Sequence, residues 1–289
     1  MKKVLLAGAT GHFGRHLLLE LKQQGFYVKV LVRSARRARD LMPEPDEILR
    51  ADATKPETLK GCCEGIDVVI SALGKSISLK NREKASFHDI NWGANYNLLQ
   101  EAMAAGVPQF IYTSAFKAEQ YPKLAFFKAH ADFSDTLRSS GISYTILQPT
   151  ALFSVFEEVV AMARKRQIGI MGSGSPLTNP IYEGDLAKVA VEQIGAPSRE
   201  IPLGGQTTYS RHDLVRIACQ VAKHKGKVLS VPFAVVDTIL PLVKLLNRNL
   251  FDKLAFLIAV SKVDCVAPQV GNLTLEEYFE ISPLETTSA

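Results

Sequence analysis

The sequence predicts an α/β fold in which helices cover both faces of a doubly wound, mostly parallel sheet. Short runs rich in β-branched residues alternate with longer amphipathic segments, and the short runs are apolar at consecutive positions. Consecutive apolar residues are typical of parallel strands that are buried on both faces. Six strands are expected, at residues 3–7, 27–32, 47–51, 67–71, 109–113 and 143–147.

Helices are expected between most of these strands. Apolar residues recur at helical spacing over residues 12–24, 91–105 and 123–140, and a glycine follows each segment directly. Glycine is favoured just after the last turn of a helix because it adopts the left-handed conformation without strain. This alternation of strand and helix along the chain predicts parallel strands joined by helical crossovers.

The second half of the chain follows a different pattern. After Pro149 the regular alternation weakens, and most of the remaining sequence has helical spacing, interrupted by one more expected strand at 200–203. We therefore expect a first domain over residues 1–150 and a smaller, mostly helical lobe over 151–289, with elements of the lobe returning to the sheet.

The distribution of charge argues against some classes of function. The net charge of the 289 residues is only +5, and four arginines lie together within residues 33–39. Such a cluster indicates a local anion site, whereas nucleic-acid binding needs a broad basic face. Charged residues and prolines interrupt the apolar stretch 228–260, so no membrane span and no nucleic-acid partner are expected.

The four cysteines form no metal-binding or disulfide pattern. His12 and His16 share a helix face, but no third ligand accompanies them, so no metal site is expected. The apolar run that follows Met1 is too short for a signal peptide. These features together predict a cytoplasmic protein.

The first expected strand runs directly into a glycine-rich loop, and a helix follows at once. The loop contains Gly8, Thr10, Gly11, His12, Phe13 and Gly14. Glycines at this spacing let the backbone turn tightly and approach a pyrophosphate, whose charge is met by free amides at the helix N-terminus. In this context the motif predicts a Rossmann-type dinucleotide site; a tight turn without a ligand is the alternative.

The residue after the second strand predicts which dinucleotide binds. An NAD site usually has an acidic residue there, about 20 residues after the loop, to bind the ribose hydroxyls. Here the residue is Arg33, and Arg37 lies close by in sequence. Guanidinium groups suit the 2′-phosphate of NADP, so NADP(H) is expected in preference to NAD(H). An arginine-rich, solvated helix start is the alternative.

Further cofactor contacts are expected after the third and fourth strands, because open sheets bind ligands at the carboxyl ends of their strands. Asp52, followed by Ala53, is placed to hold the adenine amino group, or alternatively to cap a helix near Pro56. Small residues after the fourth strand would let the backbone pass close to the cofactor ribose. They belong to the segment Ser71, Ala72, Leu73 and Gly74.

Several further segments, together with those above, resemble one known superfamily. They are residues 51–54, 70–74, 89–91, 97–99, 110–114, 140–150, 179–181 and 185–187. With the glycine-rich loop they resemble the short-chain dehydrogenase/reductase superfamily, in its atypical branch of NmrA-like and complex I 39 kDa subunit-like proteins. The resemblance covers nearly the whole chain, and it is specific for the superfamily but not for a substrate.

The resemblance implies an active site with a serine after the fifth strand and a YxxxK pair on the next helix. Ser114 and Lys128 match two of these three positions, but Leu124 stands where the tyrosine is expected. Lys128 would anchor the nicotinamide ribose and relay a proton, and Ser114 would hydrogen-bond the substrate. Pro149 matches a cofactor-binding position, although Gln148 precedes it where the family often has arginine.

Two functions are compatible with this pattern. The first is an NADP(H)-dependent oxidoreductase that transfers a hydride to or from a small carbonyl, alkene or sugar-like substrate. The second is a non-catalytic NADP(H)-binding redox sensor or assembly protein, which the missing tyrosine favours. A homodimer through the helices at 91–105 and 123–140 is one possible assembly, and a monomer is the other.

Overall fold

A computed structural model describes residues 1–81 and 83–281. These residues form two compact units. The first comprises residues 1–76, 83–148 and 183–202, and the second comprises 77–81, 149–182 and 203–281. Each unit has its own buried core.

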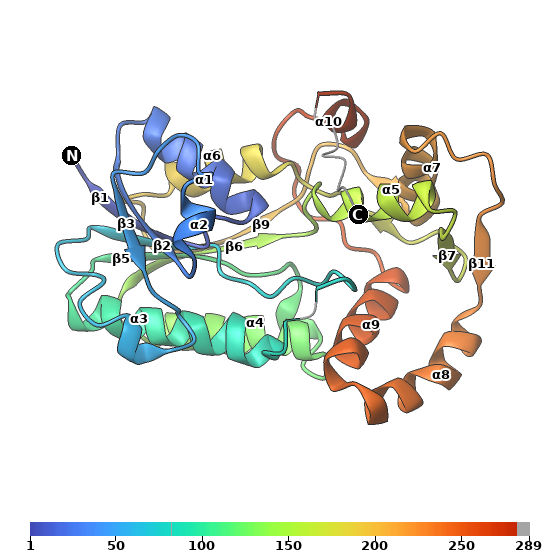
Figure 1. Cartoon of the computed structure of the whole chain (residues 1–289), viewed down its shortest axis with the longest axis horizontal. Coiled ribbons are helices and arrows are strands. Elements are labelled where there is room, and N and C mark those ends of the chain that lie inside the picture. The colour runs from blue at the N-terminus through green and yellow to red at the C-terminus, as the bar shows by residue number, and fades with distance from the viewer. Residues whose placement is uncertain (82, 282–289) are drawn as a thin grey trace. The chain divides into compact units, whose positions relative to one another are not determined.

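The first unit is built on a seven-stranded sheet with the order β3-β2-β1-β4-β5-β6-β9 (Figure 1). Its strands are β1 (Lys3–Ala7), β2 (Tyr27–Val32), β3 (Glu47–Arg50), β4 (Val68–Ser71), β5 (Gln109–Thr113), β6 (Ser143–Pro149) and β9 (Arg199–Leu203). The paired strands from β3 to β6 are all parallel. This order reverses direction at β1, so the predicted doubly wound α/β fold is confirmed, with every predicted strand within two residues of its expected bounds.

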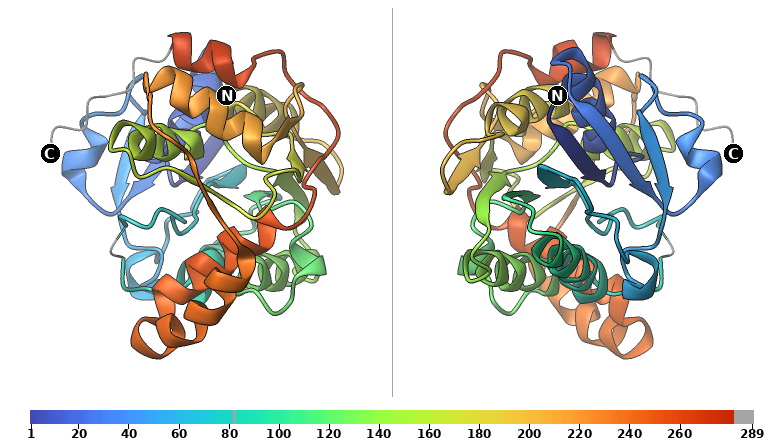
Figure 2. Two further views of the ribbon diagram at one scale, coloured as in Figure 1. Left: turned by 90° about the vertical axis from the view of Figure 1, so that its right-hand side faces the viewer. Right: turned by 90° about the vertical axis from the view of Figure 1, so that its left-hand side faces the viewer.

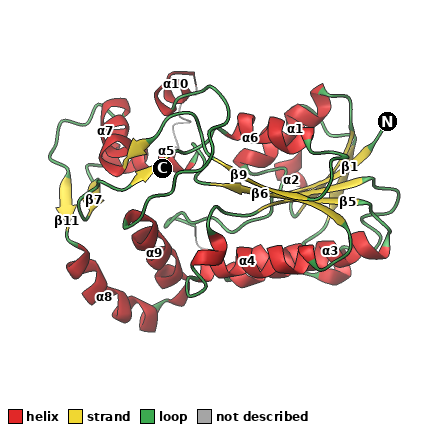
Figure 3. Ribbon diagram, turned by 180° about the vertical axis from the view of Figure 1, so that it is seen from behind, coloured by secondary structure: helices red, strands yellow, loops and turns green. Residues whose placement is uncertain are grey.

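Helices cover both faces of this sheet (Figures 1 and 3). One face carries α1 (His12–Gln23) and α6 (Glu183–Glu192), and the other carries α3 (Asn95–Ala104) and α4 (Ala125–Arg138). Shorter elements are α2 (Ala35–Ala38), η1 (Pro56–Thr58), η2 (His88–Ala94) and η3 (Ala118–Gln120). The largest core side chains, among them Phe110, Tyr112 and Phe133, are fully buried between β5 and α4.

The helix expected at 91–105 differs from the prediction at its start. Residues His88–Ala94 form a π-helical turn, and regular α-helix begins only at Asn95. The buried Asn95 amide donates to the Asn91 carbonyl at 2.9 Å. A side chain that donates to a backbone carbonyl competes with the backbone hydrogen bonds of a regular α-helix. Single π-helical turns of this kind occur frequently at functional sites.

The second unit is mostly helical, with two small two-stranded sheets. Its helices are α5 (Val155–Arg164), α7 (Arg211–Val221), α8 (Phe233–Leu246), α9 (Arg248–Ser261) and α10 (Leu275–Ile281). The small sheets pair β7 (Gly169–Met171) with β11 (Leu229–Val231), and β8 (Leu177–Thr178) with β10 (Tyr209–Ser210). Within the described residues, no helix is both long and apolar enough to cross a membrane.

One buried lysine fixes the short segment 77–81 within the second unit. The Lys253 ammonium on α9 donates to the carbonyl oxygens of Ser78 at 2.5 Å and Asn81 at 2.9 Å. Burial lowers the pKa of Lys253, and the two carbonyls accept two of the three N–H groups of its ammonium. A residue far along the chain therefore holds this loop in place.

Candidate cofactor-binding and active site

The predicted site residues follow the carboxyl ends of adjacent parallel strands. Ala7 at the end of β1 pairs with Leu31 of β2 on one side and with Ser71 of β4 on the other. The strand β4 in turn pairs with β5, which ends at Thr113. The glycine-rich loop, the residues after β2, β3 and β4, and Ser114 therefore follow the same edge of one sheet, where open α/β sheets bind their ligands.

The glycine-rich loop has no room for side chains at two positions. Gly8 has a φ of +90°, and a Cβ there would lie 2.6 Å from the Ala72 carbonyl oxygen. A Cβ on Gly14 would lie 2.0 Å from the Gly8 oxygen. The Gly11 amide donates to the same Gly8 oxygen at 3.0 Å, which closes the turn. The sequence requires glycine here because the strand, the turn and the helix approach one another at backbone distance.

The glycine-rich loop leads directly into the N-terminus of α1, which is suited to bind an anion. Gly11 is the N-cap of α1 and has no side chain to cover the first amides, and the first turn contains no carboxylate. Phe13 is buried in the core, whereas His12 is exposed. Free amides and the positive end of a 12-residue helix fit a pyrophosphate. The cradle formed by Gly8, Gly11 and Gly14 therefore fits a dinucleotide.

Arg33 follows β2 at the same edge, and its side chain is 57% exposed. The guanidinium lies 3.2 Å from the carboxylate of Glu83, and this hydrogen bond lowers the pKa of Glu83. Arg37 on α2 is also exposed. Glu83 was not expected from the sequence, because it lies 50 positions away from its partner. A phosphate at Arg33 would share the arginine with this carboxylate.

The residues after β3 form a local turn. The Asp52 carboxylate accepts hydrogen bonds from the Thr54 amide at 3.1 Å and the Thr54 hydroxyl at 2.8 Å. The N-cap of η1 is Lys55, so the alternative that Asp52 caps this helix is wrong. Asp52 instead closes an Asx-type turn with Thr54, just before the helix. Ala53 is buried, and its carbonyl accepts from the Asn97 amide at 2.9 Å.

Two asparagines hold the segment after β4. The buried Ser71 hydroxyl donates to Asn95 at 2.5 Å, and the Leu73 amide donates to Ser71 at 3.3 Å. The amide of Lys75 donates to the Asn91 side chain at 2.8 Å. This backbone, from Ser71 past Ala72 and Gly74, is therefore fixed by the turns at the start of α3. Asn91 lies in a segment that carries the family resemblance, but the role of Asn95 was not predicted.

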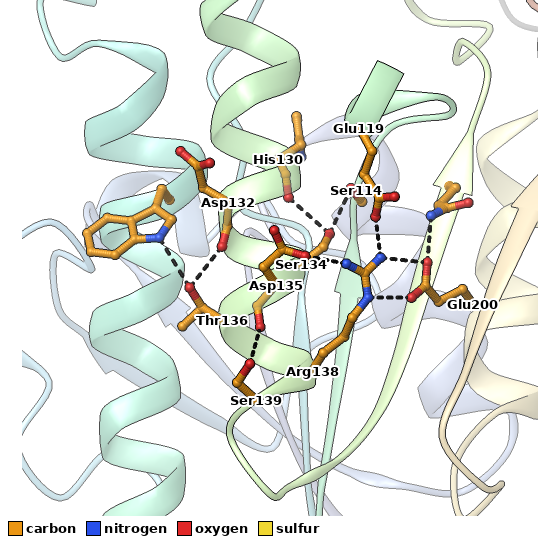
Figure 4. Close-up of polar contacts among 12 residues, drawn as sticks. Ser114, Glu119, His130, Asp132, Ser134, Asp135, Thr136, Arg138, Ser139 and Glu200 are labelled. Atoms are coloured by element: carbon orange, nitrogen blue, oxygen red, sulfur yellow. Dashed lines mark hydrogen bonds and ion pairs between the residues drawn. The ribbon is translucent and has the colours of Figure 1, made fainter. Parts of the chain in front are cut away.

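Ser114 lies directly after β5 and is nearly buried, with an exposed fraction of 5%. Its hydroxyl lies 3.3 Å from that of Ser134, which donates to the His130 carbonyl at 2.9 Å (Figure 4). Lys128 is exposed, and its ammonium forms an ion pair with Asp132 at 2.6 Å. The structure thus places Ser114 against the buried face of α4 and pairs Lys128 with a neighbouring carboxylate.

A buried polar chain beside Ser114 was missed by the sequence analysis. His130 lies between the Tyr112 hydroxyl, 2.7 Å from Nδ1, and the Asn91 amide, 3.0 Å from Nε2. Burial lowers the pKa of His130 to about 3 and raises that of Tyr112. Because the Asn91 oxygen accepts from Lys75, its NH₂ group donates to Nε2, which assigns the proton of the neutral ring to Nδ1.

The residue before Pro149 joins an ionic cluster. Gln148 donates to Glu200 at 2.9 Å, and the same carboxylate accepts from Arg138 at 2.6 Å (Figure 4). Arg138 also pairs with Asp135 and Glu119, and its hydrogen bonds to Glu200 and Glu119 raise the pKa of the arginine. Gln148 therefore takes part in a network that ties α4 to β6 and β9. Pro149 is the last residue of β6.

Comparison with known proteins is consistent with this geometry. A family model described as NAD(P)H-binding matches residues 8–197. The photosystem II assembly factor Ycf39 of Synechocystis sp. is 24% identical over 293 residues, which cover 99% of this chain and 88% of Ycf39. The 40 kDa subunit of NADH-ubiquinone oxidoreductase from Neurospora crassa is 22% identical over 84% of this chain and 66% of the subunit.

Among solved structures, the NADPH complex of the NADPH-dependent quinone oxidoreductase QOR2 from Escherichia coli has a similar fold. Its TM-score is 0.75 at 19% identity, and the match covers 96% of this chain and 98% of the other. The family model spans the glycine-rich loop, the carboxyl ends of the parallel strands, and the helices α1 and α4. The chain therefore belongs to the NAD(P)H-binding family.

Proposed function

We propose that this protein is an NADP(H)-dependent oxidoreductase acting on a small carbonyl, alkene or sugar-like substrate. The observation that carries the proposal is the cradle of Gly8, Gly11 and Gly14 at the same sheet edge as Ser114. The NADPH-bound state of a fold neighbour, QOR2, supports the choice of cofactor. When bound, the cofactor supplies or accepts the hydride.

The residues of the chain then bind and orient the substrate and the cofactor, and they transfer protons. Ser114, held by Ser134, offers a hydroxyl to the substrate oxygen at the end of β5. Lys128 holds the nicotinamide ribose and passes a proton, for which its ammonium has to leave Asp132. Pro149 and the fixed segment from Ser71 to Gly74 form backbone walls along the cofactor.

Exchange of Arg33 for Asp is expected to weaken NADPH binding about 10-fold, equivalent to about 1.4 kcal/mol, and to leave NADH binding unchanged or stronger. The reason is that a carboxylate repels the 2′-phosphate that the guanidinium would bind. Titration of each variant with both nucleotides, followed by ligand fluorescence, measures this change. Arg199→Asp alters another exposed arginine of the same unit and serves as the matched control.

Glu83→Gln provides the opposite arm of this test. Removal of the carboxylate releases Arg33 from its ion pair, so NADPH should bind more tightly than to the wild type. Equal NADPH affinity of the wild type and Arg33→Asp would exclude Arg33 as the 2′-phosphate site.

Catalysis is tested by turnover of NADPH with a panel of aldehydes, ketones, enones and quinones. With an accepted substrate, Ser114→Ala and Lys128→Ala should each lower kcat at least about 10-fold, the usual scale for loss of a group that acts in proton transfer. Lys123→Ala, an exposed lysine on the approach to the same helix, should keep the wild-type rate. Wild-type kcat in Lys128→Ala would remove this lysine from the mechanism.

A non-catalytic role is the second candidate, and three observations favour it. Leu124 occupies the position of the usual tyrosine, and Lys128 is engaged by Asp132. Ycf39, which aligns over nearly the whole chain, is named an assembly factor. Tight NADPH binding without turnover of any member of the panel would favour this function, whereas turnover that depends on Ser114 would favour the oxidoreductase.

A further inference from the structure

Helix α8 presents an apolar stripe to solvent. Val235, Ile239, Leu242 and Leu246 follow one another at helical spacing and are 49%, 53%, 59% and 78% exposed. Leu245, beside the stripe, is 83% exposed. Exposed apolar residues on a protein surface usually occur singly, so a continuous stripe of them indicates a binding surface.

The opposite side of α8 is already occupied. Phe233, Val236, Leu240 and Val243 recur at helical spacing on the other side and are half-buried. The helix α8 packs against α9, as the two orange-red helices in Figures 1 and 2 show. The internal Pro241 lies within the helix, which continues to Leu246. Among residues 1–81 and 83–281, the exposed stripe is therefore the face of α8 that no other element covers, and the other face is anchored in the second unit.

Positive charge gathers in the same part of the chain. Residues 223–262 contain seven lysines and arginines and two aspartates, a net charge of +5 that equals the net charge of the whole chain. Lys223, Lys225 and Lys227 are exposed in the loop before β11. The exposed apolar residue Leu229, at the start of β11, follows this loop directly. Exposed basic residues and an exposed apolar residue are therefore adjacent in this part of the chain.

A pocket of about 490 Å³ lies between α7 and β11, next to this loop. Its wall combines the cations Arg216 and Lys223 with the apolar residues Val228 and Leu229. His224 also lines the pocket; Nδ1 donates to the Ala163 carbonyl at 3.0 Å, and the buried Nε2 has no hydrogen-bond partner within the described part of the chain. Cations beside apolar walls suit a phosphate that is attached to a hydrocarbon chain.

We propose that α8 and the loop 223–229 form a docking surface for an anionic lipid bilayer. The stripe from Val235 to Leu246 lies in the interface between headgroups and acyl chains, and the loop lysines contact lipid phosphates. A membrane surface fits better than a protein surface because the apolar stripe and the basic loop together match a bilayer that is apolar inside and anionic outside. The proposal does not depend on the oxidoreductase function.

The test is co-sedimentation of the full chain with vesicles of phosphatidylcholine alone, or of phosphatidylcholine with phosphatidylglycerol. Binding is expected only with the anionic lipid and should weaken as salt increases, because screening reduces the attraction between exposed charges. The triple variant Ile239→Gln/Leu242→Gln/Leu246→Gln and the triple variant Lys223→Gln/Lys225→Gln/Lys227→Gln should each reduce binding at least about 10-fold.

The matched control changes three exposed apolar residues of the first unit, namely Leu19→Gln, Ile48→Gln and Met103→Gln. This variant should bind vesicles like the wild type, and the circular dichroism of all variants should confirm that they fold. Absence of binding to anionic vesicles, or undiminished binding of the α8 variant, would overturn the proposal. So would a wild-type dimer in sedimentation velocity that the α8 variant dissociates, because a second copy of the chain would then occupy the stripe.

Discussion

Gly14→Ala is expected to weaken NADPH binding at least about 100-fold and to destabilise the protein by about 3 kcal/mol, as overpacked backbone contacts do. The added Cβ would lie 2.0 Å from the Gly8 oxygen and 2.8 Å from the Ala9 Cα. Both neighbours are backbone atoms, so the conflict is relieved only if β1 and α1 move apart. That movement displaces the amides that would hold the pyrophosphate. Thermal unfolding and fluorescence titration with NADPH measure the two effects.

Gly11→Ala is the matched variant, because it adds the same methyl group three residues earlier in the same loop. A Cβ there would be 3.4 Å from the Gly8 oxygen, an ordinary contact, and so the melting temperature should stay close to that of the wild type. Its NADPH affinity should still fall, since the methyl group would cover the amides of the α1 N-terminus. If Gly14→Ala bound NADPH like the wild type, the dinucleotide would not occupy this loop.

The fold could be predicted closely because its signals are local. Buried parallel strands have continuous apolar runs, and Gly25, Gly106 and Gly141, which follow predicted helices, all have positive φ values. The π-turn at His88–Ala94 was not predictable in this way. It is associated with Asn91 and Asn95, whose hydrogen-bond partners at Lys75 and Ser71 lie 16 and 24 positions away.

The candidate site was predictable where one segment determines its own conformation. The loop from Gly8 to Gly14 is such a segment, and the structure has the close backbone contacts that its glycines imply. Glu83 beside Arg33 and the Gln148–Glu200 contact join segments that are distant in sequence, and no periodic pattern indicates them. Their discovery requires the three-dimensional arrangement.

The buried face of helix α4 could be predicted from the sequence, although His130 on that face was not identified. Its buried positions Phe127, His130, Ser134 and Leu137 recur at helical spacing, so the face that meets β5 could have been derived from the sequence. Derivation of that face would have drawn attention to His130. The resemblance instead drew attention to Lys128, which lies at an exposed position of the same helix.

His130 is expected to make the protein less stable as the pH falls below about 6.5. In the folded chain burial lowers its pKa to about 3, from an ordinary value of 6.5. Between these values the unfolded chain binds a proton that the folded chain does not, so acid favours unfolding. By about pH 4.5 the loss should reach about 2 to 3 kcal/mol in the free energy of unfolding, at about 1.4 kcal/mol per pH unit. Urea denaturation at several pH values measures it.

His130→Gln separates this contribution from all other titrating groups. Glutamine can still hydrogen-bond Asn91 or Tyr112 but does not titrate, so its free energy of unfolding should fall less steeply with pH than that of the wild type. His212→Gln changes an exposed histidine and should follow the wild-type curve. Parallel curves for the wild type and His130→Gln would mean that the buried ring accepts a proton without penalty. In that case water or a carboxylate must reach it, and the neutral chain from Tyr112 through His130 to Asn91 would not describe the folded protein.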